Sequence, residues 1–253
     1  MAMSENLNNN NGYIGTLALN RNELLLPNYN KYVTSLIISI WLKYRQEIES
    51  NEYQILDFGA GLGTISIEFQ SKASMEVQCF EIDDFLVRNL KEKNLKTFTQ
   101  FEEIKSKYDL IYSSNVLEHI EDDINAIKSI ANKLKKNGHL ILFVPAFNIL
   151  FSKIDTELGH FRRYTISDLT AKMQSAGFEI QDARYCDSMG FLAWFSVKIF
   201  KIGQKMDRRV SLGMKIFDKI FLPFSIKIDQ AFPRIPFGKN LLIIGIKKDN
   251  LPK

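Results

Sequence analysis

Two carboxylates flank a glycine-rich turn that could hold a small charged ligand. Gly59 and Gly61 follow the apolar run Ile55–Phe58, and glycines there let the backbone turn tightly and let a ligand lie against it. Asp57 stands two residues before the first glycine, where a carboxylate suits an ammonium group and would repel a pyrophosphate. The Gly-x-Gly-x-Gly spacing also differs from the Gly-x-Gly-x-x-Gly of dinucleotide-binding proteins. The turn therefore favours a ligand with an amino-acid moiety.

The second carboxylate, Glu81, ends the next apolar run along the chain, 18 residues beyond Gly63. In adjacent parallel strands this position lies beside the glycine turn, where a carboxylate can accept hydrogen bonds from both hydroxyls of a ribose. Together the two carboxylates predict a ligand with an amino-acid and a ribose part, bound where parallel strands end.

The elements that must position these residues are expected in an α/β order. From about Tyr53 onward, short β-rich apolar runs alternate with helical stretches, which favours a parallel sheet covered on both faces. The expected strands are Gln54–Phe58, Glu76–Glu81, Leu95–Thr99, Leu110–Ser113, His139–Pro145, Glu179–Cys186 and Leu241–Lys247. The expected helices are Tyr29–Glu47, Thr64–Ser71, Asp84–Lys93, Asp122–Lys136 and Ile166–Ala176, the fourth of them stopped by Asn137-Gly138 and the last capped by Thr165 or Ser167.

A run after the fourth expected strand, Asn115–Asp123 (NVLEHIEDD), resembles class I S-adenosylmethionine-dependent methyltransferases, and more narrowly a bacterial branch described as type 11 or type 12 methyltransferases. Further motifs of that branch recur in order: Asn28-Tyr29-Asn30, Val144-Pro145-Ala146, Gly159-His160-Phe161-Arg162-Arg163-Tyr164 and Pro236-Phe237-Gly238. The resemblance covers roughly Glu23 to Lys247. It implies a Rossmann-like class I methyltransferase fold, with a seven-stranded, mostly parallel sheet, helices on both faces and a helical insertion before the last strand.

The resemblance also implies that the cofactor is S-adenosyl-L-methionine. On this basis the glycine turn lines the methionine and ribose, Glu81 and its neighbour Ile82 hold the ribose, and the residues after the fourth strand close over the sulfonium. Tyr29, with Tyr32, would belong to an aromatic lid over the cofactor, or it would pack in the core. The branch usually places an acidic residue after its third strand for the adenine amine, whereas this chain has Thr99-Gln100-Phe101. Gln100 could bond the adenine and Phe101 could stack on it, or Phe101 could serve the core. The implied cofactor residues are Asp57, Gly59, Ala60, Gly61, Glu81, Ile82, Gln100, Asn115, Val116, Leu117 and Tyr29.

The acceptor of the methyl group is expected to bind at the loop after the fifth strand, Ala146–Tyr164, because parallel sheets bind ligands where their strands end. If the acceptor is a hydroxyl or an ammonium, a base must remove its proton. His160 is the first candidate, since an imidazole titrates near neutrality, and His119 is the second. Arg162 and Arg163 could clamp an anionic group, or one of them could pair with Asp155. The predicted acceptor-binding residues are Asp155, Arg162, Arg163 and Tyr164.

Composition narrows the class of protein. In 253 residues, 45% of them hydrophobic, no run approaches the roughly 18 apolar residues that span a membrane. The polar N-terminus has no apolar signal region, so we expect a cytoplasmic protein with a flexible tail at 1–20 and a single domain at 21–253. Cys79 and Cys186 lie in apolar runs as core thiols. No metal is predicted, because the three histidines include no pair at ligand spacing.

The stretch 187–239 interrupts the last two strands and is predicted to form a helical lid or insertion. From Phe191 onward the chain has thirteen Lys and Arg against four Asp and Glu, and these basic residues lie among bulky apolar ones. Such segments shape a pocket, form a dimer interface or rest weakly on an anionic membrane. We expect a small-molecule or lipid-linked acceptor and no nucleic acid. The competing functions are a nucleotide-cofactor oxidoreductase and a non-catalytic cofactor-binding protein.

Overall fold

A seven-stranded sheet is the centre of the computed structural model, which describes residues 25–45, 53–73, 75–199 and 208–248. Its strands are β1 (Ile55–Phe58), β2 (Val77–Phe80), β3 (Thr97–Phe98), β4 (Tyr108–Ser114), β5 (Leu134–Pro145), β6 (Phe178–Cys186) and β7 (Asn240–Lys247). They lie in the order β3-β2-β1-β4-β5-β7-β6. The first five are parallel, whereas β7 runs antiparallel to both β5 and β6. The predicted fold, a mostly parallel sheet of seven strands, is therefore confirmed.

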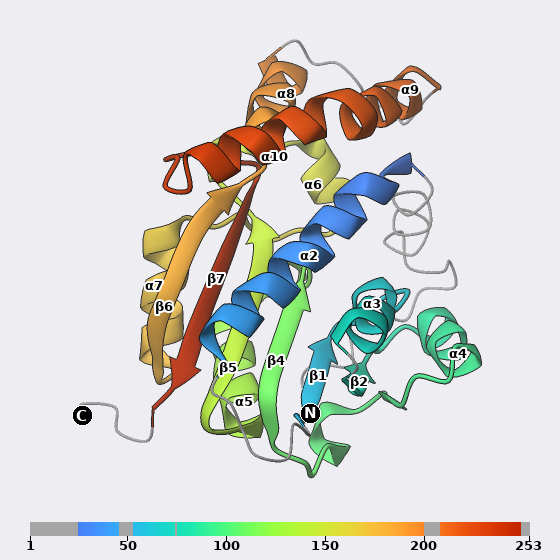
Figure 1. The fold of residues 1–253 in the computed structure, drawn as a ribbon, viewed down its shortest axis with the longest axis vertical. Coiled ribbons are helices and arrows are strands. Elements are labelled where there is room, and N and C mark those ends of the chain that lie inside the picture. Colours follow the sequence, from blue (N-terminus) through green and yellow to red (C-terminus); the bar gives the residue numbers. More distant parts are fainter. Residues whose placement is uncertain (1–24, 46–52, 74, 200–207, 249–253) are drawn as a thin grey trace.

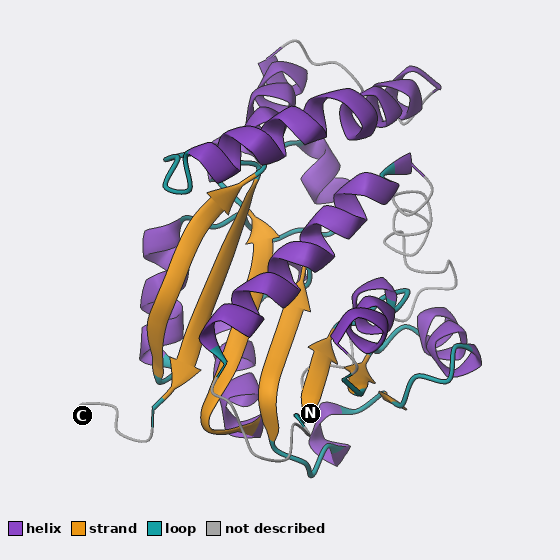
Figure 2. Cartoon of the chain, in the orientation of Figure 1, coloured by secondary structure: helices purple, strands orange, loops and turns teal. Residues whose placement is uncertain are grey.

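Helices cover both faces of this sheet (Figures 1 and 2). On one face α2 (Pro27–Tyr44) and α3 (Thr64–Ala73) pack on β1, β4 and β5, and the core there includes Trp41, Phe69 and Tyr112. On the other face α5 (Asp123–Lys133) and α7 (Ile166–Ser175) enclose a second core. The helix α4 (Asp84–Glu92) follows β2. Since the strands are buried on both sides, they read as continuous apolar runs in the sequence.

The fourth predicted helix ends earlier than expected, and the reason lies in the sheet. The helix α5 stops at Lys133, and Leu134 already pairs with Tyr108 of β4. Asn137 does take the left-handed conformation expected of a stop, with φ of 58°. It lies within β5, next to the irregularity in the β4–β5 register, where a Cβ at Gly138 would meet the Tyr108 carbonyl at 2.9 Å. The predicted cap of α7 is Thr165, whose hydroxyl accepts from the Asp168 amide at 3.2 Å.

The insertion between β6 and β7 contains helices, as predicted. They are α8 (Ser188–Ile199), α9 (Arg208–Ile216), a π-helical turn (Phe217–Phe221) and α10 (Leu222–Ala231). Pro223 does not break this stretch; it occupies the first turn of α10, directly after the π-helical turn. The helices lie across the end of the sheet at which β4 and β5 finish (Figure 1). We call that end the carboxyl edge.

Both ends of the insertion are tied together at a neck. Cys186 pairs with Asn240 in the sheet, and the Lys239 amide donates to the Asp187 carbonyl at 2.9 Å. The Asp187 side chain is fully buried and accepts from the Gly190 amide and the Ser225 hydroxyl. The predicted tail at 1–20 lies outside the described residues.

Candidate active site

The glycine turn between β1 and α3 has a backbone that side chains would disturb. Gly59, Gly61 and Gly63 all adopt positive φ, at 79°, 55° and 77°. A Cβ on Gly59 would lie 2.4 Å from a methyl of Val116, so the turn packs directly against the loop after β4. The amides of Gly59 and Ala60 both donate to the Phe80 carbonyl, at 2.9 and 3.1 Å. Three strand ends, those of β1, β2 and β4, thus meet at this turn.

Asp57 lies beneath the turn and is almost fully buried. Its carboxylate accepts hydrogen bonds from the Ser66 hydroxyl at 2.7 Å and the Tyr112 hydroxyl at 2.9 Å. Burial raises the pKa of Asp57 to about 7, although these two hydrogen bonds oppose the rise. The carboxylate therefore ties α3 and β4 to the turn, and its contact with a ligand ammonium stays a prediction.

Glu81 places its carboxylate against the same turn, as the spacing predicted. One oxygen accepts from the Gly61 amide at 2.9 Å, and the other accepts from the amides of Ile82 and Asp83 at 2.7 and 3.0 Å. Burial raises the pKa of Glu81 although these backbone hydrogen bonds lower it. The next side chain, Ile82, is 53% exposed at the end of β2. A carboxylate beside an exposed apolar side chain suits a ribose and the flat base attached to it.

The residues after β4 divide between surface and core. Asn115 is exposed with φ of 54°, Val116 covers Gly59, and the Leu117 side chain is buried in the core. Left-handed non-glycine residues recur near the ends of the next two strands, Phe147 two residues after β5 and Asp187 directly after β6, with φ of 61° and 63°. Such backbone is costly and clusters at functional sites, which singles out the carboxyl edge.

Two predicted cofactor contacts fit less well. Phe101 packs edge-on against Phe58 and Phe80, with ring centroids 5.3 and 5.2 Å apart, and so serves the core rather than an exposed stacking surface. Gln100 is exposed next to it. Tyr29 is buried in α2, accepts from the Asn240 side-chain amide at 2.5 Å and receives the Lys239 ammonium over its ring at 4.5 Å. The structure thus places Tyr29 at the neck of the insertion.

The loop after β5 holds His160 in a defined orientation. Its Nδ1 lies 2.9 Å from an Asp155 oxygen, and Asp155 is itself only 1% exposed. Burial raises the pKa of Asp155, but hydrogen bonds from His160 and Arg163 outweigh it and hold this pKa at about 2. Because an ionised carboxylate only accepts, Nδ1 donates this hydrogen bond, which leaves Nε2 as the nitrogen that can exchange a proton.

A buried carboxylate, that of Glu118, lies near His160 Nε2. Glu118 is 0% exposed, neither of its carboxylate oxygens has a hydrogen-bond partner, and one of them lies 4.0 Å from His160 Nε2. Burial raises the pKa of Glu118 to about 7 against the opposing effect of His160. The ring of His119 meets that of His160 edge-on, with centroids 4.6 Å apart. Burial and the neighbouring His160 lower the pKa of His119 to about 4, so His119 is a weak base near neutrality.

The other predicted acceptor residues are engaged within the protein. Arg163 pairs with Asp155 at 2.8 Å, as one of the two alternatives foresaw. Arg162 pairs with Asp123 at 2.7 Å and also donates to the Glu121 carbonyl. Tyr164 is fully buried and donates to the Leu117 carbonyl and to Asp123. The structure therefore corrects the assignment for Tyr164, which has no surface left for an acceptor, and for Asp155, which orients His160.

A cluster of four aromatic side chains connects the loop after β5 to the insertion. Phe147 contacts Tyr185 and Phe191 at centroid distances of 4.4 and 5.5 Å, and Phe191 contacts Phe237 at 5.4 Å. All four side chains are partly buried. The Arg163 guanidinium lies 5.6 Å above the Trp194 ring of α8. These side chains form an aromatic wall where the loop after β5, which also carries His160, meets the insertion.

Comparison with known proteins identifies the family. The model of a family described as "Methyltransferase domain" matches residues 29–183. The chain belongs to this methyltransferase family. No curated protein matches the sequence.

Solved structures share the fold of this methyltransferase at low sequence identity. One is an S-adenosylmethionine-dependent methyltransferase from Archaeoglobus fulgidus (TM-score 0.55, 18% identity, covering 86% of this chain and 94% of the other). Another is phosphoethanolamine N-methyltransferase 2 of Haemonchus contortus in complex with S-adenosyl-L-methionine (0.52, 16%, 82% and 51%). A third is the cyclopropane synthase MmaA2 of Mycobacterium tuberculosis (0.54, 13%, 83% and 84%). The predicted S-adenosylmethionine-dependent class I methyltransferase is thereby confirmed.

The glycine turn of the methyltransferase fits this cofactor. The glycine turn at Gly61, the Glu81 carboxylate bonded to its amide and the exposed apolar side chain of Ile82 suit the methionine, the ribose and the adenine. These residues would hold the cofactor, which supplies a methyl group on a positively charged sulfur.

Sequence reasoning missed Glu118 as a functional residue, although it lies in the motif Asn115–Asp123. It also missed the grouping of Glu118 with His119 and His160, whose ligand atoms lie within 4.8 Å of one another. A carboxylate and two imidazoles are donors that divalent transition metals accept. The prediction of no metal was drawn from spacing along the chain, and spacing does not reveal this group.

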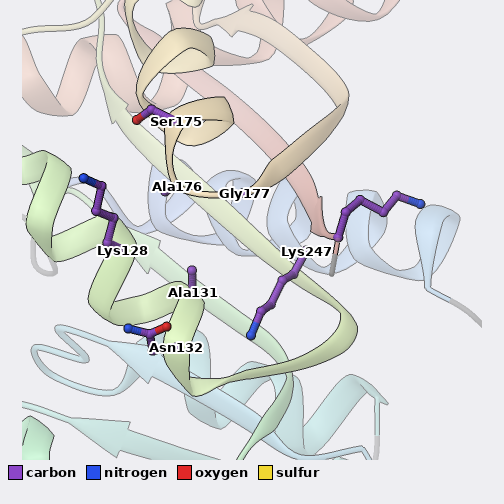
Figure 3. A pocket seen from close by; sticks show the side chains of 8 residues that line it. Lys128, Ala131, Asn132, Ser175, Ala176, Gly177 and Lys247 are labelled. Atoms are coloured by element: carbon purple, nitrogen blue, oxygen red, sulfur yellow. The ribbon is translucent and has the colours of Figure 1, made fainter. Parts of the chain in front are cut away.

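A shallow depression lies far from this chemistry (Figure 3). Its lining comes from the C-terminal ends of α5 and α7 and from the end of β7, opposite the carboxyl edge. The residues that line it are Lys128, Ala131, Asn132, Ser175, Ala176, Gly177, Lys247 and Lys248. Among the described residues, no helix is long and apolar enough to cross a membrane.

Proposed function

We propose that this methyltransferase transfers the methyl group of S-adenosylmethionine to a hydroxyl or amine of an amphiphilic acceptor, with His160 as the base. The hydrogen bond between Asp155 and His160 Nδ1, at 2.9 Å, carries the proposal. A buried carboxylate that fixes the imidazole tautomer leaves the other nitrogen to take a proton. General bases of this kind contribute roughly 10²–10⁴ in rate.

Glu118 assists the proton transfer. When His160 accepts the acceptor's proton at Nε2, it becomes a cation next to the Glu118 carboxylate, 4.0 Å away. In a buried site this attraction is stronger than in water and stabilises the imidazolium. We therefore assign to Glu118 the role of a positioning residue and keep His119, with its lower pKa, as the second candidate base.

The aromatic wall supports an acceptor with an apolar part. Phe147, Phe191 and Phe237 contact one another where the loop after β5 meets the insertion, and His160 lies in the same loop. A small amphiphile, a glycan or a lipid-linked molecule would place its apolar part there and its nucleophile at His160. This chain shares its fold with a phosphoethanolamine N-methyltransferase, whose name gives a nitrogen as the methyl acceptor. An acceptor nitrogen is one of the nucleophiles that this proposal covers.

A methyl-transfer screen tests the proposal. Cell extract incubated with the protein and methyl-labelled cofactor is partitioned into lipid, glycan, protein and small-molecule fractions. We expect label in the lipid or amphiphilic fraction with wild type and at least tenfold less with His160→Ala. Label confined to protein, or undiminished in His160→Ala, would refute the proposed acceptor or the proposed base, respectively.

A further inference from the structure

The helices α9 and α10 and the π-helical turn between them form one continuous stretch, Arg208–Ala231, that we call the outer rod. Its inner side packs on the body of the protein through Leu222 and Ser225, both fully buried. The outer side exposes a row of large apolar side chains four residues apart. These are Leu212, Ile216, Ile220 and Phe224, exposed by 60%, 41%, 53% and 58%, and Phe221 and Phe232 extend the row.

The acidic and the basic side chains of the outer rod lie on different sides of it. Its two acidic residues point inward: Asp218 is buried and accepts from the Asn28 and Tyr29 amides, and Asp229 accepts from the Asp187 amide. The described basic side chains of this segment are exposed, namely Lys215, Lys219, Lys227 and, just beyond the rod, Arg234. The outward surface is therefore apolar and cationic, with no exposed carboxylate in 212–234.

We infer that the outer rod docks on an anionic lipid bilayer. Apolar side chains can enter the boundary between headgroups and acyl chains while lysines beside them contact lipid phosphates. A second copy of the chain fits this surface less well, because a symmetric dimer buries the same surface of both copies, and 212–234 exposes basic side chains but no carboxylate that could pair with them. On a bilayer the rod would lie in the plane of the interface. Single exposed apolar residues are common on protein surfaces, but a continuous row of them marks an interaction site.

Docking would bring the active site to the membrane. The insertion that carries the rod also contacts the loop after β5, since Lys198 of α8 donates to the Ile149 carbonyl at 2.6 Å and Trp194 lies over Arg163. The carboxyl edge lies beneath the insertion (Figure 1). The inference extends the proposed function to acceptors that reside in a bilayer, yet its test does not depend on methyl transfer.

Vesicle flotation tests the docking directly. The full chain is floated with vesicles of equal parts phosphatidylglycerol and phosphatidylcholine, or of phosphatidylcholine alone, over a series of salt concentrations. We expect flotation with the anionic vesicles that fades as salt rises, and far less with phosphatidylcholine alone. Lys215→Gln with Lys219→Gln should lower partitioning about 25-fold, since each basic residue near the surface contributes about fivefold.

Matched variants separate the apolar part from the charge. Ile220→Ser with Phe224→Ser should abolish flotation, whereas Phe85→Ser, which removes an apolar side chain of 48% exposure on α4, should leave it unchanged. All of these side chains are exposed, so the variants should fold, and cofactor binding measures this. Absence of flotation at low salt overturns the inference. So does self-association without lipid that Ile220→Ser with Phe224→Ser abolishes, because the rod would then be a contact between copies of the chain.

Discussion

Replacing Glu118 by Gln should change how the stability of the protein depends on pH. The carboxyl of Glu118 is 0% exposed and has no hydrogen-bond partner, and burial raises its pKa from 4.5 to about 7. In the unfolded chain the pKa returns to the ordinary value, so between these values the folded protein binds a proton that the unfolded chain has lost. Stability conferred by this group is therefore present at low pH and is lost as pH rises through about 7.

The magnitude follows from the same two values. At about 1.36 kcal/mol for each tenfold change in proton affinity, the loss between pH 4.5 and pH 7 is about 3 kcal/mol. Gln has the shape of the neutral acid and does not titrate, so the variant should lack this part of the slope. Asp57, whose pKa is also raised to about 7, contributes equally in both proteins and cancels in the difference.

Urea unfolding of wild type and Glu118→Gln across pH 5 to 8 measures the effect. We expect the free energy of unfolding of the variant to gain on wild type by up to about 3 kcal/mol toward pH 8. The matched control is Glu157→Gln, an exposed carboxyl on the same side of the sheet, which should run parallel to wild type. Parallel curves for Glu118→Gln would mean that water or a bound cation already satisfies the buried carboxylate, and the reasoning would fail.

Four further outcomes are expected. Glu81→Ala should weaken S-adenosylmethionine binding by about 1–3 kcal/mol in calorimetry, since it leaves backbone amides and the ribose unpaired; unchanged affinity contradicts the cofactor assignment. His160→Ala should lower turnover at least tenfold at unchanged cofactor affinity, and a loss of cofactor binding instead would place His160 in the wrong half of the site. Zn²⁺ should inhibit wild type reversibly by occupying the donors around His160, with at least tenfold weaker binding to Glu118→Gln; a need for Zn²⁺ would reverse this assignment. Gly59→Ala should destabilise the protein by about 1–3 kcal/mol in thermal unfolding, and equal stability would show that the turn can yield around Val116.

The sheet was predictable because each strand is an apolar run bounded by turn residues, and the residues at strand ends follow from that order. Glu81 is the clearest case. Its position at the end of the second strand predicted that its side chain lies beside the glycine turn. In the structure its carboxylate accepts from the Gly61 amide at 2.9 Å. The limit of α5 was not predictable, because Leu134 is drawn into the sheet by pairing with Tyr108, a contact that helix signals along the chain do not encode.

The acceptor side was only partly predictable because its contacts join distant segments. Arg162 and Arg163 are adjacent in sequence, yet one pairs with Asp123 and the other with Asp155. No local pattern distinguishes an arginine that holds a loop from one that clamps a substrate. Glu118 was passed over for the same reason: its burial opposite His160 arises only when the loop after β5 folds over the end of β4.

The neck holds the two ends of the insertion together, and this affects how the insertion can vary during evolution. Because the Lys239 amide donates a hydrogen bond to the Asp187 carbonyl, the chain leaves the sheet and returns to it at one point. Lengthening a connection with fixed ends costs little, about 0.6 kcal/mol for each doubling of its length. The segment between these residues can therefore change in length or in its exposed side chains while β6 and β7 keep their register, as long as inward contacts such as those of Asp218 with the Asn28 and Tyr29 amides are kept. If the proposed function holds, new acceptor preferences would arise by changes in this one segment, because the residues proposed to hold the methyl donor lie outside it.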